Sequence, residues 1–183
     1  MDLKETIYSR RAVREFTAEP IAQETINGLI DAAIQAPSAT NEQPWSFTVV
    51  RDRPLLDRIS REAKIHMLRT THAGLLWRSL REDPDFQIFY HAPVLIVISS
   101  MTEGPWAVID CSLAAENLML AATAAGLGTC WIGFAQGYLN TPEGKKALGL
   151  PDRWVTVAPI IVGHPKGPVA PVPRKKPEVR WVG

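Results

Sequence analysis

The amino-acid sequence predicts a three-layer α+β domain in which helices flank a small mixed or antiparallel sheet. Three observations predict it: helical and extended segments follow one another in mixed order, two runs of β-branched residues are apolar on both faces, and one long helix is apolar around most of its circumference. A chain of 183 residues can bury a substantial core, so we expect one domain over residues 1–183.

The first half of the chain alternates helix and strand. Residues 21–34 place apolar side chains at helical spacing, and Pro37 ends that helix because a proline disfavours helical backbone before it. Residues 46–50 (SFTVV) have the β-branched and aromatic composition of a strand. Residues 54–90 are predicted to be helical but less regular. Residues 93–100 (PVLIVISS) predict a central strand that is buried on both faces.

A long apolar helix follows over residues 109–125 (IDCSLAAENLMLAATAA). Because small or apolar residues occupy most of its circumference, we expect it to be buried on several sides, either in a large core or against a partner subunit. Gly126 and Gly128 are predicted to end it, since glycine is favoured after a helix C-terminus. Residues 129–134 (TCWIGF) are then expected to be extended.

The last quarter of the chain contains one more helix, one strand and an arm. Thr141 is a predicted N-cap before a proline, and the helix should stop at Gly149. Residues 155–162 (VTVAPIIV) predict the last strong strand. Residues 163–183 contain five prolines, which disfavour an independent helix or central strand. We expect an extended arm that lies on a second subunit, with residues 179–182 able to pair as an edge strand.

Composition excludes several function classes. The formal net charge is +1, which gives no argument for binding nucleic acid or an anionic membrane. The N-terminus carries acidic residues and lacks an apolar signal region, and the apolar stretch at 118–125 is too short to span a bilayer, so we expect a cytoplasmic protein. Cys111 and Cys130 are expected to be reduced core thiols, and the four histidines have no metal-ligand spacing.

Three segments are candidates for binding chemistry. The basic residues gather at the two ends of the chain: Arg10, Arg11 and Arg14 near the start, and Arg174, Lys175 and Lys176 near the end. Guanidinium groups suit a cofactor phosphate because they donate two parallel hydrogen bonds to its oxygens. The alternative is that both runs are solvated surface charge.

The other two segments contain polar or glycine-rich loops. Residues 36–45 (APSATNEQPW) hold amide and hydroxyl groups that could hydrogen-bond a heteroaromatic ring, or they form a simple polar turn. Residues 126–133 (GLGTCWIG) let the backbone approach a flat ligand closely, and the amides of Trp131–Gly133 could point at it. The spacing is not that of the GxGxxG dinucleotide fingerprint.

In combination and order these segments resemble the FMN-dependent nitroreductase family. The resemblance includes IYSRRAVREF near the N-terminus, APSATNEQPWSFTVV, DCSLAAENLMLAA followed by GLGTCWIGF, VGHP, and the tail rich in proline, arginine and lysine. It covers residues 7 to 176, and only residues 60–90 match nothing specific. It implies the nitroreductase-like fold and a homodimer that binds FMN at the subunit interface, with the C-terminal arm contributing to the dimer.

The resemblance also implies roles for the cations. Arg10 and Arg11 would hold the FMN phosphate and ribityl side, and Arg14 would approach the pyrimidine edge near N1 and O2. A tail cation, Arg174 or Lys175, would complete the phosphate site.

The remaining contacts are implied for the flavin ring. One ring face would lie along Trp131, Ile132 and Gly133, with the Gly133 amide near the flavin N5. The other subunit would cover the same flavin with Pro37, Ser38, Ala39 and Asn41. Two positions depart from the family pattern: Ala12 stands where many relatives have serine, and Gly133 where some have glutamate. Both changes leave the arginine and lysine residues named above in place.

The implied activity is a ping-pong cycle in which FMN takes hydride from NADPH or NADH and then reduces a small aromatic acceptor, such as a nitro compound or a quinone. The flavin carries the chemistry and Arg14 gives electrostatic support, so no general base is required. Aromatic residues in 65–90 would wall the acceptor pocket, unless they are ordinary core or interface residues: Trp77, Phe86, Phe89 and Tyr90.

Three alternatives remain open at this point. The protein could hold or store FMN without efficient turnover. The same fold could perform other flavin chemistry, such as dehalogenation, flavin destruction or oxidation of a heterocycle. The chain could also be a structural dimer without a cofactor, in which the arginines are only surface charge.

Overall fold

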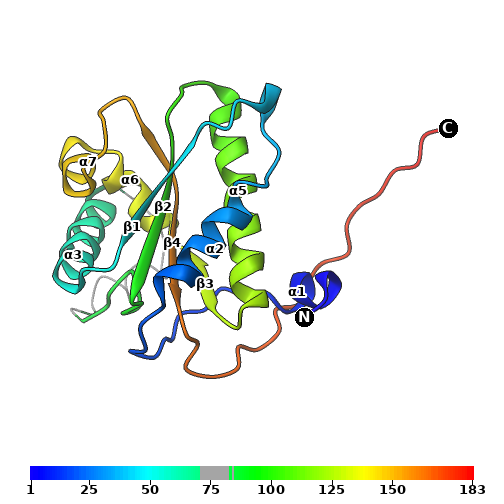
Figure 1. The fold of residues 1–183 in the computed structure, drawn as a ribbon, viewed down its shortest axis with the longest axis horizontal. Coiled ribbons are helices and arrows are strands. Elements are labelled where there is room, and N and C mark those ends of the chain that lie inside the picture. Colours follow the sequence, from blue (N-terminus) through cyan, green and yellow to red (C-terminus); the bar gives the residue numbers. More distant parts are fainter. Residues whose placement is uncertain (71–82, 84) are drawn as a thin grey trace.

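The computed structural model describes residues 1–70, 83 and 85–183, and it shows a sheet between two helical layers (Figure 1). The three-layer α+β fold predicted from the sequence is therefore confirmed. In chain order the elements are α1 (Leu3–Ser9), α2 (Gln23–Ala33), the 3-10 turn η1 (Ala39–Asn41), β1 (Trp45–Val50), α3 (Arg53–Thr70), β2 (Val94–Ser100), α5 (Pro105–Ala124), β3 (Gly128–Trp131), α6 (Gly133–Leu139), α7 (Pro142–Leu148) and β4 (Val155–Gly163).

The sheet has four strands in the order β1-β2-β4-β3, and each neighbouring pair is antiparallel. The central position predicted for residues 93–100 is confirmed, because β2 pairs with β1 on one side and β4 on the other. Alternate residues of β2 enter different cores: Ile96 and Ile98 face one helical layer, whereas Leu95 and Val97 face the other. A strand buried on both faces reads as a continuous apolar run for this reason.

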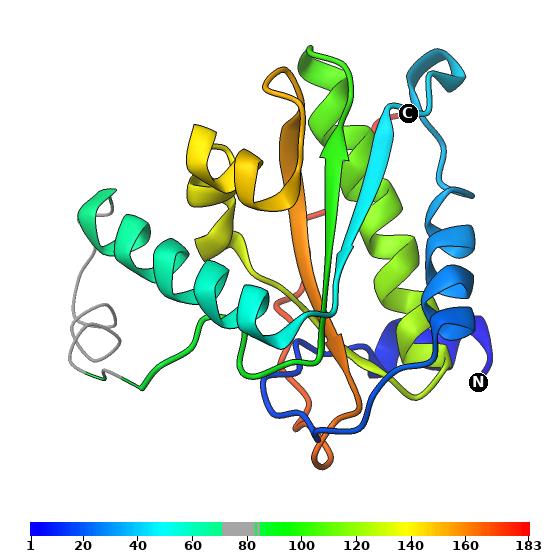
Figure 2. The same cartoon turned by 60° about the vertical axis from the view of Figure 1, so that its left-hand side comes forward.

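Two helical layers cover the faces of the sheet (Figure 2). Helices α2 and α5 pack on one face, and α3, α6 and α7 lie on the other. Among the described residues, α5 alone is long and apolar enough to cross a membrane, and one side of it packs against α2 and the sheet. Gly126 (φ 75°) ends α5 as predicted, and the Leu127 amide donates to the Ala122 carbonyl at 2.8 Å.

Several boundaries differ from the predictions. Helix α5 begins at Pro105 rather than at residue 109, and α1 and α6 were not predicted. The extended segment predicted over 129–134 ends at Trp131, because Gly133 and Phe134 already belong to α6. The helical prediction for 54–90 holds over α3 but is wrong for residues 85–90, which form turns; residues 71–82 and 84 lie outside the described part.

The C-terminal arm is extended, as predicted. Its root lies beside the N-terminal segment, where Phe16 and Pro165 form an isolated antiparallel bridge and the Thr17 amide donates to the His164 carbonyl at 2.9 Å. All residues from 166 to 183 are exposed, and the arm leaves the domain beside α1 (Figure 1). Residues 179–182 pair with none of the described strands, so the predicted edge strand is not formed within the described part of one protomer.

Candidate functional site

The N-terminal basic segment lies along the free edge of β3. Ala12 forms a parallel bridge with Thr129, and the Val13 amide donates to the Thr129 carbonyl at 2.9 Å. Gly128 makes this approach possible, because a Cβ there would lie 2.7 Å from the Val13 Cβ. The first and third segments singled out in the sequence are thus side by side, although the bridged residues Ala12 and Thr129 are 117 positions apart (129 − 12). The glycine at this position makes room for the Val13 side chain of the same protomer.

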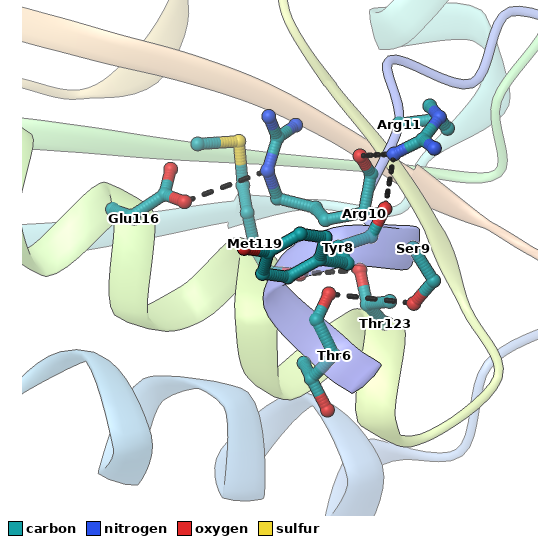
Figure 3. A network of polar contacts seen from close by, with 8 residues as sticks. All are labelled: Thr6, Tyr8, Ser9, Arg10, Arg11, Glu116, Met119 and Thr123. Atoms are coloured by element: carbon teal, nitrogen blue, oxygen red, sulfur yellow. Dashed lines mark hydrogen bonds and ion pairs between the residues drawn. The ribbon is translucent and has the colours of Figure 1, made fainter. Parts of the chain in front are cut away.

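Arg10 and Arg11 follow α1 and point to different sides (Figure 3). The Arg10 Nε lies 3.4 Å from the Glu116 Oε1 on α5, and 22% of its side chain is exposed. The Arg11 Nη1 instead donates to the carbonyls of Tyr8 and Arg10, at 2.7 and 2.8 Å. Arg10 therefore faces the α5 side, while Arg11 satisfies carbonyls at the end of α1.

Arg14 is exposed and lies beside two buried or half-buried groups. Its guanidinium carbon is 5.9 Å from the centre of the Tyr90 ring. Burial raises the pKa of the Cys130 thiol, and the positive charges of Arg14 and Arg10 oppose that rise. Both guanidinium groups therefore lie close enough to β3 to act on the same thiol.

The corner between β3 and α6 presents a glycine. Gly133 is exposed, and an added Cβ would meet nothing within 4 Å. The preceding Ile132 is buried, and its amide donates to the Pro159 carbonyl at 2.8 Å. Of the three amides predicted to face a ligand, that of Ile132 is therefore engaged in the sheet. Trp131 is half-buried against the α2/α5 core.

The loop predicted to cover a ligand is rigidly built. The Ser38 Oγ accepts from the Gln43 amide at 3.0 Å, and the Ala39 amide donates to the Asp110 Oδ1 at 3.1 Å. Thr40, Asn41 and Gln43 all have left-handed backbone, with φ of 50°, 57° and 49°. Such conformations cost free energy in residues other than glycine and persist only where neighbouring contacts hold them.

This loop and the basic segment lie at opposite ends of α5 (Figure 1). The loop is tied to Asp110 near the start of α5, whereas Arg10 is paired with Glu116 nearer its end. Pro37 and Ser38 precede the loop's tie at Ala39 and share its location. Within one chain the structure therefore brings together the predicted residues at 10–14 and 131–133, but not those at 37–41.

The tail cations stand apart from the other candidates. Arg174 and Lys175 are exposed on the arm, and no hydrogen bond or ion pair joins them to the rest of the described chain. The root of the arm nevertheless lies next to the basic segment, since the Lys166 amide donates to the Glu15 carbonyl at 3.0 Å. The two ends of the chain thus converge at the root of the arm but not at its cations.

Only some of the aromatic residues predicted to line the acceptor pocket are free of the core. Phe89 is 2% exposed and belongs to the core beneath α3, which confirms the alternative of a core residue. Phe86 and Tyr90 are half-buried and pack edge to face, with ring centres 5.6 Å apart. Trp77 lies outside the described residues.

Sequence reasoning missed two features. Asp110 is a carboxylate with 2% exposure inside an apolar helix, and its burial becomes visible only once α2 and the loop are in place. A cavity of about 580 Å³ also opens between α3, α6 and α7. There Tyr138 donates a short hydrogen bond to Glu62, and burial followed by this bond raises the pKa of the phenol. The lining of this cavity combines cations and carboxylates of α3 and α7 with Tyr138 of α6, so no local motif marks it.

Residues 7–164 match the sequence profile of the Nitroreductase family. The chain belongs to the nitroreductase family. A protein from Archaeoglobus fulgidus, provisionally named an NADH dehydrogenase/NAD(P)H nitroreductase, is 34% identical over 87% of this chain and 83% of its own length.

Two further relatives of this nitroreductase-family chain bear on its chemistry. A nitroreductase structure with bound FMN from Bacteroides fragilis has a TM-score of 0.87 and 26% identity, and the match covers 100% of both chains. The iodotyrosine deiodinase 1 of Rattus norvegicus is 30% identical over 94% of this chain and 65% of its own length.

Proposed function

We propose that this chain is an FMN-dependent oxidoreductase that takes hydride from NADH or NADPH and reduces a small aromatic acceptor, such as a nitro compound or a quinone, by a ping-pong mechanism. The FMN-bound relative and the NAD(P)H-dependent activities named for other relatives support this proposal. The observation that carries it is the juxtaposition of Arg10, Arg14 and the open Gly133 corner along one edge of β3.

The residues on this edge suit the two parts of FMN. When bound, FMN accepts and delivers the hydride, while the protein supplies position and charge. Arg10 is a guanidinium that could bind the phosphate by paired, charge-assisted hydrogen bonds. Arg14 carries a full positive charge that would stabilise negative charge on the pyrimidine edge of the ring. Gly133 has no side chain, so a flat ring could lie against the backbone there.

A homodimer would complete the site. Helix α5 leaves an apolar stripe exposed in the single chain, formed by Trp106 (59% exposed), Ile109 and Leu113. A stripe of this kind fits an interface between two copies. In a symmetric dimer with its two-fold axis across the stripe, the start of one α5 approaches the end of the other. Ser38 and Asn41 of one protomer would then approach Arg10 of the other.

The arm and the cellular location are proposed on separate grounds. The exposed apolar residues of the arm, including Trp181 at 92%, fit a contact with the second protomer, where Arg174 or Lys175 would complete the phosphate site. Both cysteines are free and buried, which suits a reducing compartment, and we propose a cytoplasmic location.

Anaerobic titration of the purified, FMN-loaded protein with NADH and with NADPH tests the proposed function. We expect rapid bleaching by at least one nicotinamide and parallel double-reciprocal plots with a nitroaromatic or quinone acceptor. Arg14→Ala should slow flavin reduction or weaken FMN binding, whereas Arg153→Ala, at an exposed arginine outside this edge, should do neither. A protein that binds FMN but bleaches very slowly with both nicotinamides would be a storage protein, and the oxidoreductase proposal would be wrong.

A second candidate function keeps the site and changes the acceptor. The similarity to iodotyrosine deiodinase favours reductive dehalogenation as that alternative. Halogenated phenols and nitroaromatics should be compared as acceptors for the same reduced protein. Halide release at a rate above that of nitro reduction would favour the dehalogenase.

A further inference from the structure

Tyr90 has a backbone conformation that bulky residues rarely adopt. Its φ is 50°, and that of the following His91 is 57°. Left-handed backbone is unfavourable in residues other than glycine, and where it persists it often marks a functional site. The turn that contains Tyr90 is therefore a candidate functional element.

Contacts from α3 hold this turn on both sides of Tyr90. The Ser60 Oγ accepts a buried hydrogen bond from the Ile88 amide at 3.1 Å. The Arg53 Nη1 donates to the His91 carbonyl at 3.0 Å, and its Nη2 lies 2.8 Å from the His91 Nδ1. The strained backbone is thus fixed by side chains from a separate element, as is required for such a conformation to persist.

The turn fixed by α3 places the Tyr90 ring beside Arg14. The guanidinium carbon lies 5.9 Å from the ring centre, and the Phe86 ring packs edge to face on Tyr90, with an angle of 85° between the ring planes. Burial raises the pKa of the Tyr90 phenol, and the positive charge of Arg14 opposes that rise. The ring contact and this electrostatic interaction both link Tyr90 to Arg14.

The kind of partner that Arg14 has is informative. Within the described part of the chain, no carboxylate forms an ion pair with Arg14, in contrast to Arg10 and Glu116. A carboxylate would orient a guanidinium but would also neutralise its charge. An aromatic ring holds the planar group by stacking and cation–π attraction and leaves its positive charge uncompensated.

We propose that Tyr90 is a positioning residue that fixes the Arg14 guanidinium beside β3 and keeps its full charge available to the bound flavin. This inference rests on the proposed function, in which Arg14 faces the N1 and O2 edge of FMN. It assigns Tyr90 a role in the flavin half of the site, rather than the stacking surface for the acceptor expected from the sequence.

Three variants test the proposal. Tyr90→Phe retains the ring, Tyr90→Asn removes the ring but tolerates left-handed backbone, and Arg14→Ala removes the guanidinium. In the apo protein, the Arg14 Nε–H proton should show a ring-current shift by NMR that survives in Tyr90→Phe and is lost in Tyr90→Asn. This readout needs no flavin and no turnover. It also shows whether the Asn variant is folded, since its other resonances should stay dispersed.

In the FMN-loaded protein, the rate constant for anaerobic reduction should stay within about twofold for Tyr90→Phe. It should fall about 2- to 30-fold for Tyr90→Asn, the range of a cation–π contact of about 0.5–2 kcal/mol. The midpoint potential of bound FMN should fall in the same order. Because Tyr90 acts through Arg14, the double variant Arg14→Ala/Tyr90→Asn should match Arg14→Ala alone.

Two kinds of result overturn the proposal, and they are distinguishable. If Arg14→Ala slows reduction while Tyr90→Asn does not, or if their effects multiply in the double variant, Tyr90 does not position Arg14 and the proposed function stands. If Arg14→Ala changes neither the reduction rate, the potential nor the FMN occupancy, the role of Arg14 in the proposed function fails, and the role of Tyr90 fails with it. Absence of the ring-current shift in wild-type apo protein also refutes the contact.

Discussion

Gly128→Ala should damage both stability and FMN binding, because it separates the basic segment from β3. An added Cβ would lie 2.7 Å from the Val13 Cβ and Cγ2 and 2.8 Å from its Cγ1. Non-bonded carbon atoms prefer about 3.5–4.0 Å, so each of the three contacts is too short by about 1 Å. Rotating the Val13 side chain moves only the two Cγ atoms. The clash with the Cβ therefore requires the backbone of Val13 to move away from β3.

The cost follows from that movement. Overpacking of this kind costs about 1–3 kcal/mol, and loss of the hydrogen bond from the Val13 amide to the Thr129 carbonyl adds about 1 kcal/mol. The expected loss of about 2–4 kcal/mol lowers the midpoint of thermal unfolding by roughly 4–16 °C in a domain of this size. Because Arg14 follows Val13 directly, the Kd for FMN should also rise by about tenfold or more, which corresponds to about 1.4 kcal/mol.

Thermal unfolding of apo protein at one fixed concentration, followed by titration with FMN, measures both effects. Fixed conditions matter because bound ligand and assembly both shift an unfolding midpoint. Gly28→Ala is the matched control: Gly28 is exposed within α2, an added Cβ meets nothing within 4 Å, and the change should stabilise by about 0.5–1 kcal/mol. If Gly128→Ala unfolds at the wild-type temperature with the wild-type Kd for FMN, the close approach at β3 is not as tight as described.

Three further outcomes can be checked. Thr141→Ala removes the side-chain acceptor at the start of α7 and should cost about 1 kcal/mol by urea denaturation, and an unchanged midpoint would contradict the cap. Burial, and then the charge of Asp110, raises the pKa of the Cys111 thiol to about 12. The free energy of unfolding should therefore fall between about pH 9 and 12, because the unfolded chain loses the thiol proton there while the folded chain keeps it. The fall should be less steep in Cys111→Ala, and equal slopes in the two proteins would refute this. Asp110→Ala leaves the Ala39 amide without its acceptor, so the loop should loosen and a glutamate-specific protease should cut faster at Glu42. Asp110→Asn keeps an acceptor oxygen at this position and should stay protected.

Elements whose residues carry their own signals were predicted from the sequence. Strand β2 is apolar on both faces because both faces are buried, and its central position follows directly. Helix α7 has an N-cap at Thr141 and a left-handed Gly149 (φ 67°) at its end, as its sequence indicates. These signals are local, so no knowledge of the tertiary structure was needed.

The missed elements are short and lack a clear apolar pattern. Helix α6 follows Ile132, which provides no side-chain cap, and it contains Gly133 and Gly137, so its sequence reads as a continuation of the strand before it. Helix α1 does have an N-cap at Asp2, but it is short and its apolar residues Leu3 and Tyr8 are each 71% exposed, so no core-facing pattern marks it. Short helices without a buried face are decided by tertiary context.

The candidate site shows the same division. The motifs at residues 10–14 and 126–133 were visible in the sequence, but their pairing across β3 is a long-range contact that depends on the fold. The turn at Tyr90 could not be predicted, because its left-handed backbone is held by Ser60 and Arg53 from α3. Sequence patterns thus identified the chemical groups, and tertiary contacts determined which of them face one another.

The arm sets a condition on how the proposed site assembles. Eight residues, 166–173, separate the last bridge of the arm at Pro165 from Arg174, and all are exposed in the single chain. Fixing their backbone costs about 1–2 kcal/mol per residue, or about 8–16 kcal/mol in total, whereas a charge-assisted hydrogen bond returns about 1.5–3 kcal/mol. A phosphate contact alone is therefore too weak to hold the arm. Apolar residues of this stretch, Val169 and Val172, must contribute as well, since burying one such side chain is worth about 1.5–3 kcal/mol. Assembly with a second protomer would thus have to place the arm first, and the contact of Arg174 or Lys175 with the phosphate would follow from it.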